Sequence, residues 1–323
     1  MFDHPWMAAM ELRGMARDDQ IRRGPLLVAG ATGWVGRTLL KLAREDGFQV
    51  VGVARQPDES NGFERCDVSQ RDAVDRLFQR LRPRVVFNCV RVRTEEFLSR
   101  AQPRANAGLA ELSVLLDASI RYRSRLVHVG SAAEYGRSLR RRPVTERTRP
   151  RPFNLYGRQK LAQTILALER ARRGADVVVV RLFNLVGPGE GLDTVTGSWI
   201  ARLTSPRIDV SGPVEIAATV RDFLDVRDAA RALLLLGTHA RAKGTYNTCS
   251  GRGTRIDSLV RTVARILSVD VRVRSITPRS VNGSGPTFAV GSSRKLRRLG
   301  WAPRISLERS ILDLVTEWCG HGE

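Results

Sequence analysis

Short apolar runs alternate with amphipathic segments along the first 186 residues of the chain. The runs are rich in Val and Leu, whereas the segments between them place apolar residues every three or four positions, as at Leu109, Leu112 and Leu116. A strand that is apolar throughout is buried on both faces, so this pattern predicts an α/β fold with a parallel sheet covered on both sides by helices. The predicted strands are 26–29, 49–54, 62–66, 84–89, 125–129 and 176–182, and the predicted helices are 38–46, 71–81, 106–121 and 155–173.

The alternation loosens after about Gly187. Gly, Pro, Ser and Thr become frequent there, and predicted helices at 225–237, 256–267 and 307–319 mix with short strands. We therefore predict a nucleotide-binding domain over 25–186 and a smaller lobe that makes up most of 187–323. Residues 1–24 lack the periodicity of a long helix, and we expect a disordered extension there or a start codon assigned too early.

Composition excludes several classes of protein. The 323 residues are 42% hydrophobic and 27% charged, which is ordinary for a globular chain and too apolar for a disordered one. No run of 18 apolar residues is present, and the start lacks the basic and apolar regions of a signal peptide. Cys66, Cys89, Cys249 and Cys319 are too scattered for a metal site or a disulfide framework. These features predict a cytoplasmic protein with no metal and no membrane partner.

The chain is strongly basic, with 54 Lys and Arg against 33 Asp and Glu and a formal net charge of +21. Only four of the cations are Lys. A nucleic-acid binder would use such a charge. An Arg-rich codon bias that leaves a solvated basic surface is the simpler explanation and the one we favour. A third explanation of the charge is an enzyme whose ligands carry phosphates.

A glycine-rich loop follows the first predicted strand. Glycines at 30, 33 and 36 stand between that strand and a predicted helix. This spacing lets backbone N–H groups approach a pyrophosphate at the helix N-terminus. A glycine triplet alone is weak evidence, but its place between strand and helix is the one that the mechanism requires. The residues predicted to bind a dinucleotide here are Gly30, Thr32, Gly33, Trp34, Val35 and Gly36.

The end of the second predicted strand bears on the choice of dinucleotide. NAD sites place a carboxylate there, which accepts a hydrogen bond from the ribose 2′-OH. This chain has Arg55 and no acid at that point. Because a guanidinium group pairs well with a phosphate, we predict NADP(H) rather than NAD(H). After the third predicted strand, Asp67 and Val68 are candidates to contact the adenine, although a plain strand-end cap by Asp67 is nearly as good an interpretation.

Three further residues suggest proton transfer. Tyr156 and Lys160 stand four apart on a predicted helix and therefore share a face. A free Tyr has a pKa of about 10, and a neighbouring ammonium group favours the phenolate. The same Lys side chain is suited to hold ribose hydroxyls of the cofactor. Ser131 ends the fifth predicted strand, where its hydroxyl would donate a hydrogen bond to a substrate oxygen.

With these motifs in this order, the chain resembles the extended short-chain dehydrogenase/reductases from about residue 25 to 320. This family comprises NAD(P)-dependent nucleotide-sugar epimerases, dehydratases and reductases. The resemblance implies a Rossmann-type doubly wound parallel sheet with a smaller C-terminal substrate-binding lobe. It also implies that Ser131, Tyr156 and Lys160 are catalytic and that Tyr156 and Lys160 contact the cofactor.

Two later segments extend the resemblance to the substrate. The segment 181–189 is similar to the family's Arg-x-x-Asn-x-x-Gly-Pro motif, and the segment 221–228 is similar to one in the second lobe that begins with Arg. The resemblance implies that Asn184 and Arg221 contact the diphosphate of a sugar nucleotide. We expect the loops at about 190–212 and at 277–288 to select the sugar and the base.

Departures from the family pattern narrow the chemistry. Family dehydratases carry an Asp-Glu pair directly after the catalytic Ser or Thr, whereas Ala132 and Ala133 stand here, which argues against elimination. Glu134 resembles the reductases of 4-keto-6-deoxy sugar nucleotides, and we predict that it contacts the substrate. After the fourth predicted strand, where the family usually has small residues, this chain has Asn88, Cys89, Val90 and Arg91. Asn154 and Leu155 replace a usual Ser-Pro pair before the catalytic Tyr.

The sequence therefore favours an NADP(H)-dependent oxidoreductase that reduces a keto group, as in a 4-keto reductase, on a nucleotide-linked sugar. A C4 epimerase that uses the same residues is the first alternative, and a substrate other than a sugar nucleotide is the second. A catalytically idle module that senses NADP(H) is the third, and binding to nucleic acid is expected only in that case. By resemblance, helices 106–121 and 155–173 would pair in a homodimer.

Overall fold

The computed structural model describes residues 24–56, 63–91, 108–136, 142–192, 194–205, 213–276 and 287–320. Nearly all of the predicted extension 1–24 and most of the predicted loop 277–288 lie outside the described residues. The chain divides into two compact units, and each takes segments from both predicted domains. The first comprises Met1–Gly130, Gln159–Arg181 and Ala230–Tyr246, and the second comprises Ser131–Arg158, Leu182–Ala229 and Asn247–Glu323.

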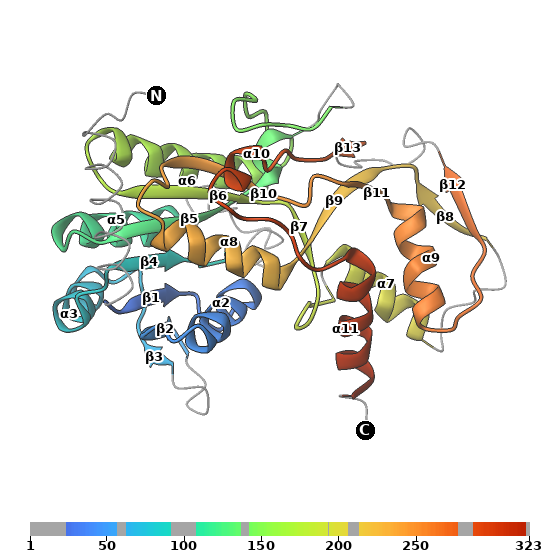
Figure 1. Ribbon diagram of the computed structural model, residues 1–323, viewed down its shortest axis with the longest axis horizontal. Coiled ribbons are helices and arrows are strands. Elements are labelled where there is room, and N and C mark those ends of the chain that lie inside the picture. The colour runs from blue at the N-terminus through green and yellow to red at the C-terminus, as the bar shows by residue number, and fades with distance from the viewer. Residues whose placement is uncertain are drawn as a thin grey trace, which may run out of the picture. The chain divides into compact units, whose positions relative to one another are not determined.

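A seven-stranded sheet forms the centre of the first unit (Figure 1). Its strands lie in the order β10-β6-β5-β4-β1-β2-β3, and β1 pairs in parallel with both β2 and β4. This architecture confirms the predicted doubly wound α/β fold. The strand order reverses between β1 and β4, where sheets of this kind bind their ligands. The strands are β1 (Leu26–Ala29), β2 (Val50–Ala54), β3 (Glu64–Arg65), β4 (Val85–Asn88), β5 (Arg125–Ser131), β6 (Val177–Leu182) and β10 (Gly244–Thr248).

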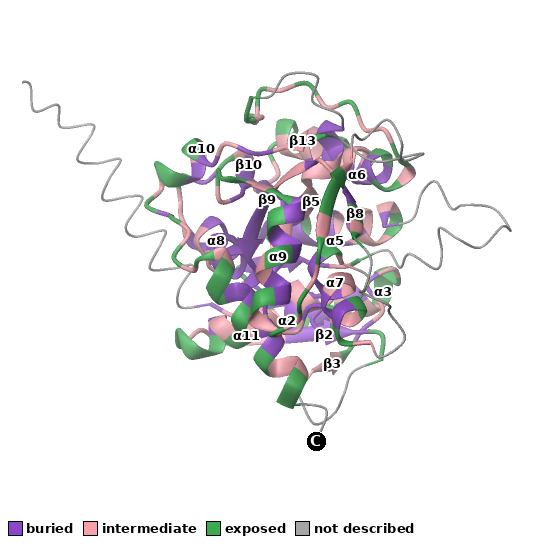
Figure 2. Cartoon of the chain, turned by 90° about the vertical axis from the view of Figure 1, so that its right-hand side faces the viewer, coloured by how far each residue is buried: buried purple, intermediate pink, exposed green. Residues whose placement is uncertain are grey.

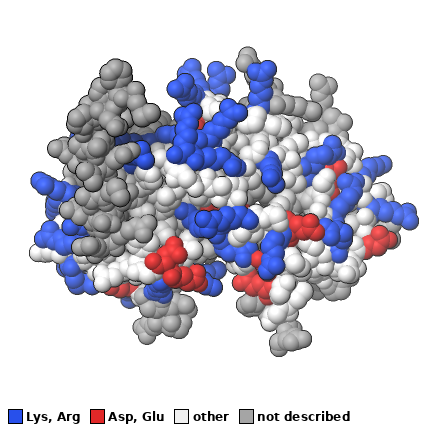
Figure 3. All heavy atoms as spheres, viewed as in Figure 1, with Lys and Arg blue, Asp and Glu red and all other residues white. Residues whose placement is uncertain are grey.

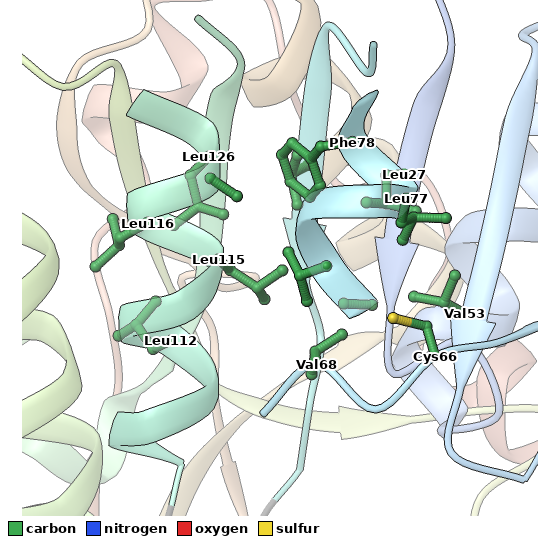
Figure 4. Close-up of a cluster of buried hydrophobic side chains, with 14 of the residues drawn as sticks. Leu27, Val53, Cys66, Val68, Leu77, Phe78, Leu112, Leu115, Leu116 and Leu126 are labelled. Atoms are coloured by element: carbon green, nitrogen blue, oxygen red, sulfur yellow. The ribbon is translucent and has the colours of Figure 1, made fainter. Parts of the chain in front are cut away.

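Helices cover both faces of this sheet because successive strand residues point to opposite sides. On one side, Leu27 and Leu126 pack with Phe78 and Leu115 in a single apolar core (Figure 4). On the other side, Gly237 lies against Phe87. Figure 2 shows the buried strands and the exposed outer faces of the helices. The helices are α2 (Trp34–Glu45), α3 (Arg71–Leu81), α5 (Leu109–Arg121), α6 (Leu155–Arg172) and α8 (Val226–Thr238).

The second unit is organised around β9, which pairs with β7, β11 and β13, while β8 and β12 form a separate parallel pair. Its core joins Ile200, Val263 and Leu314 from three helices. The strands are β7 (Asn184–Val186), β8 (Val214–Ala217), β9 (Val220–Asp225), β11 (Gly253–Arg255), β12 (Val273–Ile276) and β13 (Phe288–Ala289). The helices are the 3-10 turn η2 (Ala132–Tyr135), α7 (Val195–Thr204), α9 (Ile256–Ile266), α10 (Arg294–Arg297) and α11 (Leu307–Gly320).

Several elements differ from the sequence-based expectation, and α7 is the clearest case. Helix α7 occupies part of the segment 190–212, which we expected to be a loop. Val195, Thr196 and Gly197 are poor helix formers, so the local sequence gives little sign of this helix. Two other features compensate. The Thr194 side chain accepts a hydrogen bond from the Gly197 N–H at 3.1 Å, and Ile200 is completely buried.

Cations dominate the surface, as expected from the net charge. Figure 3 shows Lys and Arg side chains over much of one face, with fewer Asp and Glu among them. Several arginines form exposed ion pairs, such as Arg71 with Asp117 and Arg265 with Glu308. Arg142 and Arg294 form no ion pair with any carboxylate in the described part of the chain. None of the helices that the structure describes is both long and apolar enough to cross a membrane.

Candidate active site

The glycine loop after β1 is shaped by two close backbone approaches. Gly30 has a φ of +79°, and a Cβ atom there would lie 2.8 Å from the backbone of Cys89. A Cβ atom on Gly36 would lie 2.2 Å from the Gly30 carbonyl oxygen. Both positions therefore require glycine. Gly33 is the N-cap of α2 and makes no side-chain cap, so the loop leads directly into a helix N-terminus, whose dipole favours an anion.

The other predicted residues of this loop lie just before α2 or in its first turn. Thr32 is exposed, and Trp34 and Val35 are partly buried in the first turn. The loop geometry and the helix N-terminus are suited to a dinucleotide pyrophosphate. A nicotinamide cofactor, when bound, supplies or accepts hydride. Contacts between this cofactor and the six loop residues remain predictions.

The unusual residues after β4 are held by Asn88. Its Oδ1 accepts a hydrogen bond from the Val90 N–H at 3.2 Å, and its Nδ2 lies 3.3 Å from Nδ1 of His128 on β5. Asn88 thus fixes the backbone of Cys89 and Val90, which lies against Gly30. His128 is buried in the sheet. Burial, with a smaller effect from the Lys160 charge, holds its pKa well below the usual value, so the imidazole is neutral.

Arg55 and Asp67 follow adjacent strands. Arg55 is exposed directly after β2. Asp67 accepts hydrogen bonds from the N–H and the hydroxyl of Ser69 at 3.0 and 2.8 Å, which is the strand-end cap that the sequence left open. These bonds, and to a smaller extent the Arg55 charge, lower the pKa of Asp67. Val68 is buried. The adenine contact of Asp67 and the phosphate contact of Arg55 remain predictions.

Ser131 ends β5 and begins the turn η2. Its Oγ accepts a hydrogen bond from the Ala133 N–H at 3.1 Å, and the Glu134 side chain accepts one from the Ser131 N–H at 2.9 Å. These reciprocal bonds form a capping box. Glu134 is completely buried. Its carboxylate is therefore engaged inside the protein, a role that the sequence analysis missed and that the Ser-x-x-Glu spacing could have indicated.

Helix α6 begins beside this turn. Asn154 accepts a hydrogen bond from the Gly157 N–H at 2.8 Å and therefore caps the helix. This contact gives a physical reason for Asn where the family usually has Ser. A Cβ atom on Gly157 would lie 2.5 Å from the Ala133 carbonyl oxygen, so the first turn of α6 packs directly on η2. Tyr156, in that first turn, is 39% exposed and accessible to a ligand.

Lys160 lies four residues beyond Tyr156 on α6. Its side chain is 7% exposed, and Nζ donates a hydrogen bond to the carbonyl oxygen of Val129 at 2.9 Å. Val129 lies on β5, two residues before Ser131. The ammonium group is thus anchored to the strand that ends at Ser131.

Asn184 and Arg221 lie on the paired strands β7 and β9. The Asn184 side chain donates a hydrogen bond to the Asp222 carbonyl oxygen at 2.9 Å. Arg221 is partly buried, and this burial lowers the pKa of its guanidinium group. The sheet of the second unit therefore brings together two residues that are 37 positions apart in the sequence. Their contact with a diphosphate remains a prediction.

Comparison with known families identifies the chain. Residues 26–249 match the model of the NAD dependent epimerase/dehydratase family. The chain belongs to this family. The match confirms the resemblance found in the sequence, and it makes the protein an enzyme of an NAD(P)-dependent family.

Individual relatives are similar to different extents. GDP-6-deoxy-D-mannose reductase of Pseudomonas aeruginosa is 34% identical over 191 residues, which is 54% of this chain and 59% of that enzyme. The dTDP-6-deoxy-L-talose 4-dehydrogenase (NAD(P)(+)) of Kitasatospora kifunensis is 28% identical over 309 residues, 90% of this chain and 94% of that one. The structure of RMD from Pseudomonas aeruginosa complexed with NADPH has a TM-score of 0.77 at 27% identity, and the match covers 92% of this chain and 99% of that one.

Proposed function

We propose that this protein reduces a keto group of a nucleotide-linked sugar with hydride from NADPH. The observation that carries the proposal is the packing of η2 on α6, which sets Ser131 beside the helix turn that contains Tyr156. The Ser131 Oγ accepts a hydrogen bond from the chain, so its own hydrogen is left for a substrate oxygen.

Each of the three residues has a distinct role in this proposal. Ser131 donates a hydrogen bond to the keto oxygen and polarises the carbonyl group. Tyr156 donates the proton that converts this oxygen to a hydroxyl. Lys160, one helical turn beyond Tyr156 on α6, would hold ribose hydroxyls of the cofactor.

Three observations favour this reaction and cofactor over others in the family. Ala132 and Ala133 offer no acid or base for elimination. The exposed Arg55 after β2 suits the 2′-phosphate of NADP(H), and the similar RMD structure is a complex with NADPH. Two of the three relatives described above have names that refer to 6-deoxy sugars linked to nucleotides. Asn184 and Arg221 would hold the diphosphate of such a substrate.

A cofactor assay tests the proposal. The purified protein is mixed with 4-keto sugar nucleotides, and NADPH absorbance is followed. We expect NADPH oxidation in proportion to the substrate, and a kcat lower by about 10³-fold in Tyr156→Phe. Arg55→Ala should raise the KM for NADPH but not for NADH. Absence of NADPH oxidation with every 4-keto sugar nucleotide would overturn the proposal.

A C4 epimerase is the second candidate, because transient oxidation and reduction would use the same three residues and the family includes epimerases by name. An epimerase would interconvert its sugars with no net change in absorbance. If neither reaction occurs and the protein retains duplex DNA at physiological salt, the result would favour a module that senses NADP(H) over an enzyme with another substrate.

We also propose that the protein is a cytoplasmic homodimer. Ile165 on α6 is 56% exposed and lies in an apolar hollow between α5 and α6, whose lining includes Leu109 and Leu166. Burial of such side chains would stabilise a dimer. Light scattering at micromolar concentration should give twice the chain mass, and a monomer would contradict the proposal.

A further inference from the structure

The complete burial of Glu134 and its hydrogen bond to the backbone of Ser131 point to a role in the reaction. We propose that Glu134 is a positioning residue, which acts on the reaction only through Ser131. The inference rests on the proposed role of Ser131 as hydrogen-bond donor to the substrate. It replaces the sequence-based expectation that Glu134 contacts the substrate itself.

Two reciprocal hydrogen bonds set the direction of the Ser131 hydroxyl. The Glu134 side chain accepts from the Ser131 N–H at 2.9 Å, and the Ser131 Oγ accepts from the Ala133 N–H at 3.1 Å. A hydroxyl group has one hydrogen and two lone pairs. Because Ala133 occupies one lone pair, the hydrogen of Ser131 must point elsewhere. The turn that Glu134 closes therefore holds the Ala133 N–H against Oγ, and the O–H bond points away from that N–H.

The Ser131 N–H has particular need of this acceptor. It lies at the last residue of β5, where the strand gives way to η2. A backbone N–H that loses its partner in a buried place has a large energetic cost, and the chain moves to reduce it. Without the Glu134 acceptor, the end of β5 would shift and carry the Ser131 Oγ with it.

The contact between η2 and α6 links this shift to Tyr156. Gly157 allows the Ala133 carbonyl oxygen to approach α6 more closely than any Cβ atom would permit. A displaced turn would therefore change the position of Ser131 relative to the helix turn that holds Tyr156. The hydrogen bonds of this turn involve only Ser131, Ala133 and Glu134, none of which is predicted to bind the cofactor. The effect should fall on kcat and leave the KM for NADPH unchanged.

The test is a double-mutant cycle between Glu134 and Ser131. Ser131→Ala should lower kcat by about 100-fold, as expected for loss of a donor to the reacting oxygen. Glu134→Ala should lower kcat by at least about tenfold, the effect of one misplaced hydrogen bond. Glu134→Gln keeps an oxygen acceptor and should stay within about threefold of the wild-type kcat. In the Ser131→Ala background, Glu134→Ala should have almost no further effect on kcat.

Asp228 provides a matched control. It is also completely buried in the second unit, and its carboxylate accepts hydrogen bonds from the N–H groups of Arg304 and Ile305. Asp228→Ala removes an acceptor of the same kind at a place without predicted catalytic residues. Its effect on kcat should be the same in the wild-type and Ser131→Ala backgrounds, which distinguishes general destabilisation from an effect through Ser131.

Several results would overturn the inference. One is an undiminished effect of Glu134→Ala in the Ser131→Ala background. Another is a Glu134→Gln variant as impaired as Glu134→Ala. A rise in the KM for the sugar nucleotide with kcat unchanged would instead support a direct substrate contact. If the wild type interconverts sugars without net NADPH oxidation, the reductase proposal fails, and the same cycle is measured on the epimerisation rate.

A measurement that needs no activity completes the test. The Ser131 amide hydrogen should exchange with solvent at least about tenfold faster in Glu134→Ala than in the wild type, since its acceptor is lost. Glu134→Gln and Asp228→Ala should leave this rate within about threefold of the wild type. Unchanged exchange in Glu134→Ala would show that the carboxylate does not hold Ser131, whatever reaction the enzyme performs.

Discussion

In the first unit, carboxylates such as Asp75 and Asp117 are partly exposed, and they pair with arginines on the surface. In the second unit, Glu134 and Asp222 are completely buried and accept hydrogen bonds from backbone N–H groups. The first unit is built on a large parallel sheet, in which the backbone N–H and C=O groups of neighbouring strands pair with one another. The second unit joins short strands and turns. Short elements leave many N–H groups without a strand partner, and buried carboxylates supply the missing acceptors.

Asp222 is the strongest example of this second kind of stabilisation. Its carboxylate accepts from the N–H groups of Ser250, Gly251 and Gly291 and from the Ser250 hydroxyl. It thus ties β9 to the segments around β11 and β13. Arg221 and Asn184 lie in one sheet, because β7 pairs with β9. The Asn184 side chain also donates a hydrogen bond to the Asp222 carbonyl oxygen. The second unit therefore depends on buried carboxylates as acceptors, and the glycine loop of the first unit depends on close packing.

Among the variants that test this difference between the two units, Asp222→Ala should have the largest effect on stability. It would leave three backbone N–H groups without an acceptor and should lower the free energy of unfolding by about 4 kcal/mol. Urea denaturation would measure the loss. Asp222→Asn retains one acceptor oxygen and should lose about half as much. Equal losses for the two variants would contradict the importance of the individual N–H contacts.

The buried carboxyl of Glu190, also in the second unit, should make stability depend on pH. Its carboxyl accepts from the Gly187 N–H and the Thr194 hydroxyl, but burial raises its pKa from 4.5 to about 7. Between these values the folded protein binds a proton that the unfolded chain releases. Stability contributed by this group therefore falls as pH rises from 4.5 to about 7. Glu190→Gln should remove this fall and gain up to about 3 kcal/mol above pH 7.

Thermal denaturation across this pH range would measure the effect of Glu190→Gln. Glu317→Gln is the control, because Glu317 accepts from the neighbouring Gly189 N–H but is only partly buried. Its stability profile should keep the wild-type shape. A Glu190→Gln profile parallel to that of the wild type would show that Glu190 is ionised throughout.

Gly36→Ala tests the close packing of the first unit. The added Cβ atom would meet the Gly30 carbonyl oxygen at 2.2 Å, so the cofactor loop would have to move. We expect NADPH affinity to fall about 100-fold, as measured by calorimetry, because the loop would no longer present its N–H groups to a pyrophosphate. Gly33→Ala, with its nearest contact at 3.3 Å, should lose much less affinity. Equal losses would argue against a steric origin.

The smallest effect is expected from the exposed ion pairs. Asp117 pairs with Arg71 at 2.9 Å and with Arg170 at 3.3 Å. Asp117→Ala should change the free energy of unfolding by less than about 1 kcal/mol, and high salt should reduce the change further. A loss as large as that of Asp222→Ala would remove the difference between the two units. Urea denaturation of the wild type and Asp117→Ala at low and high salt would measure both changes.

The sequence indicated much of the candidate site because the relevant signals are local. The glycine loop, Ser131 and the Tyr156–Lys160 pair all stand at strand ends or on a helix, and the period of apolar residues locates those elements. Glu134 was different. Its position suggested a substrate contact, whereas its side chain is completely buried and accepts a hydrogen bond from the Ser131 N–H. A sequence pattern locates a residue along the chain but does not show which way its side chain points.

The sequence by itself determined most of the first unit's elements and the family, since strands buried on both faces and amphipathic helices follow from the order of apolar residues. Only the tertiary structure decided how the second unit is assembled. Helix α7 forms despite weak local propensity because Thr194 caps it and Ile200 is buried. Asp222 is tied to Gly291, 69 residues away in the sequence. Such contacts depend on burial and on distant acceptors, which no local pattern encodes.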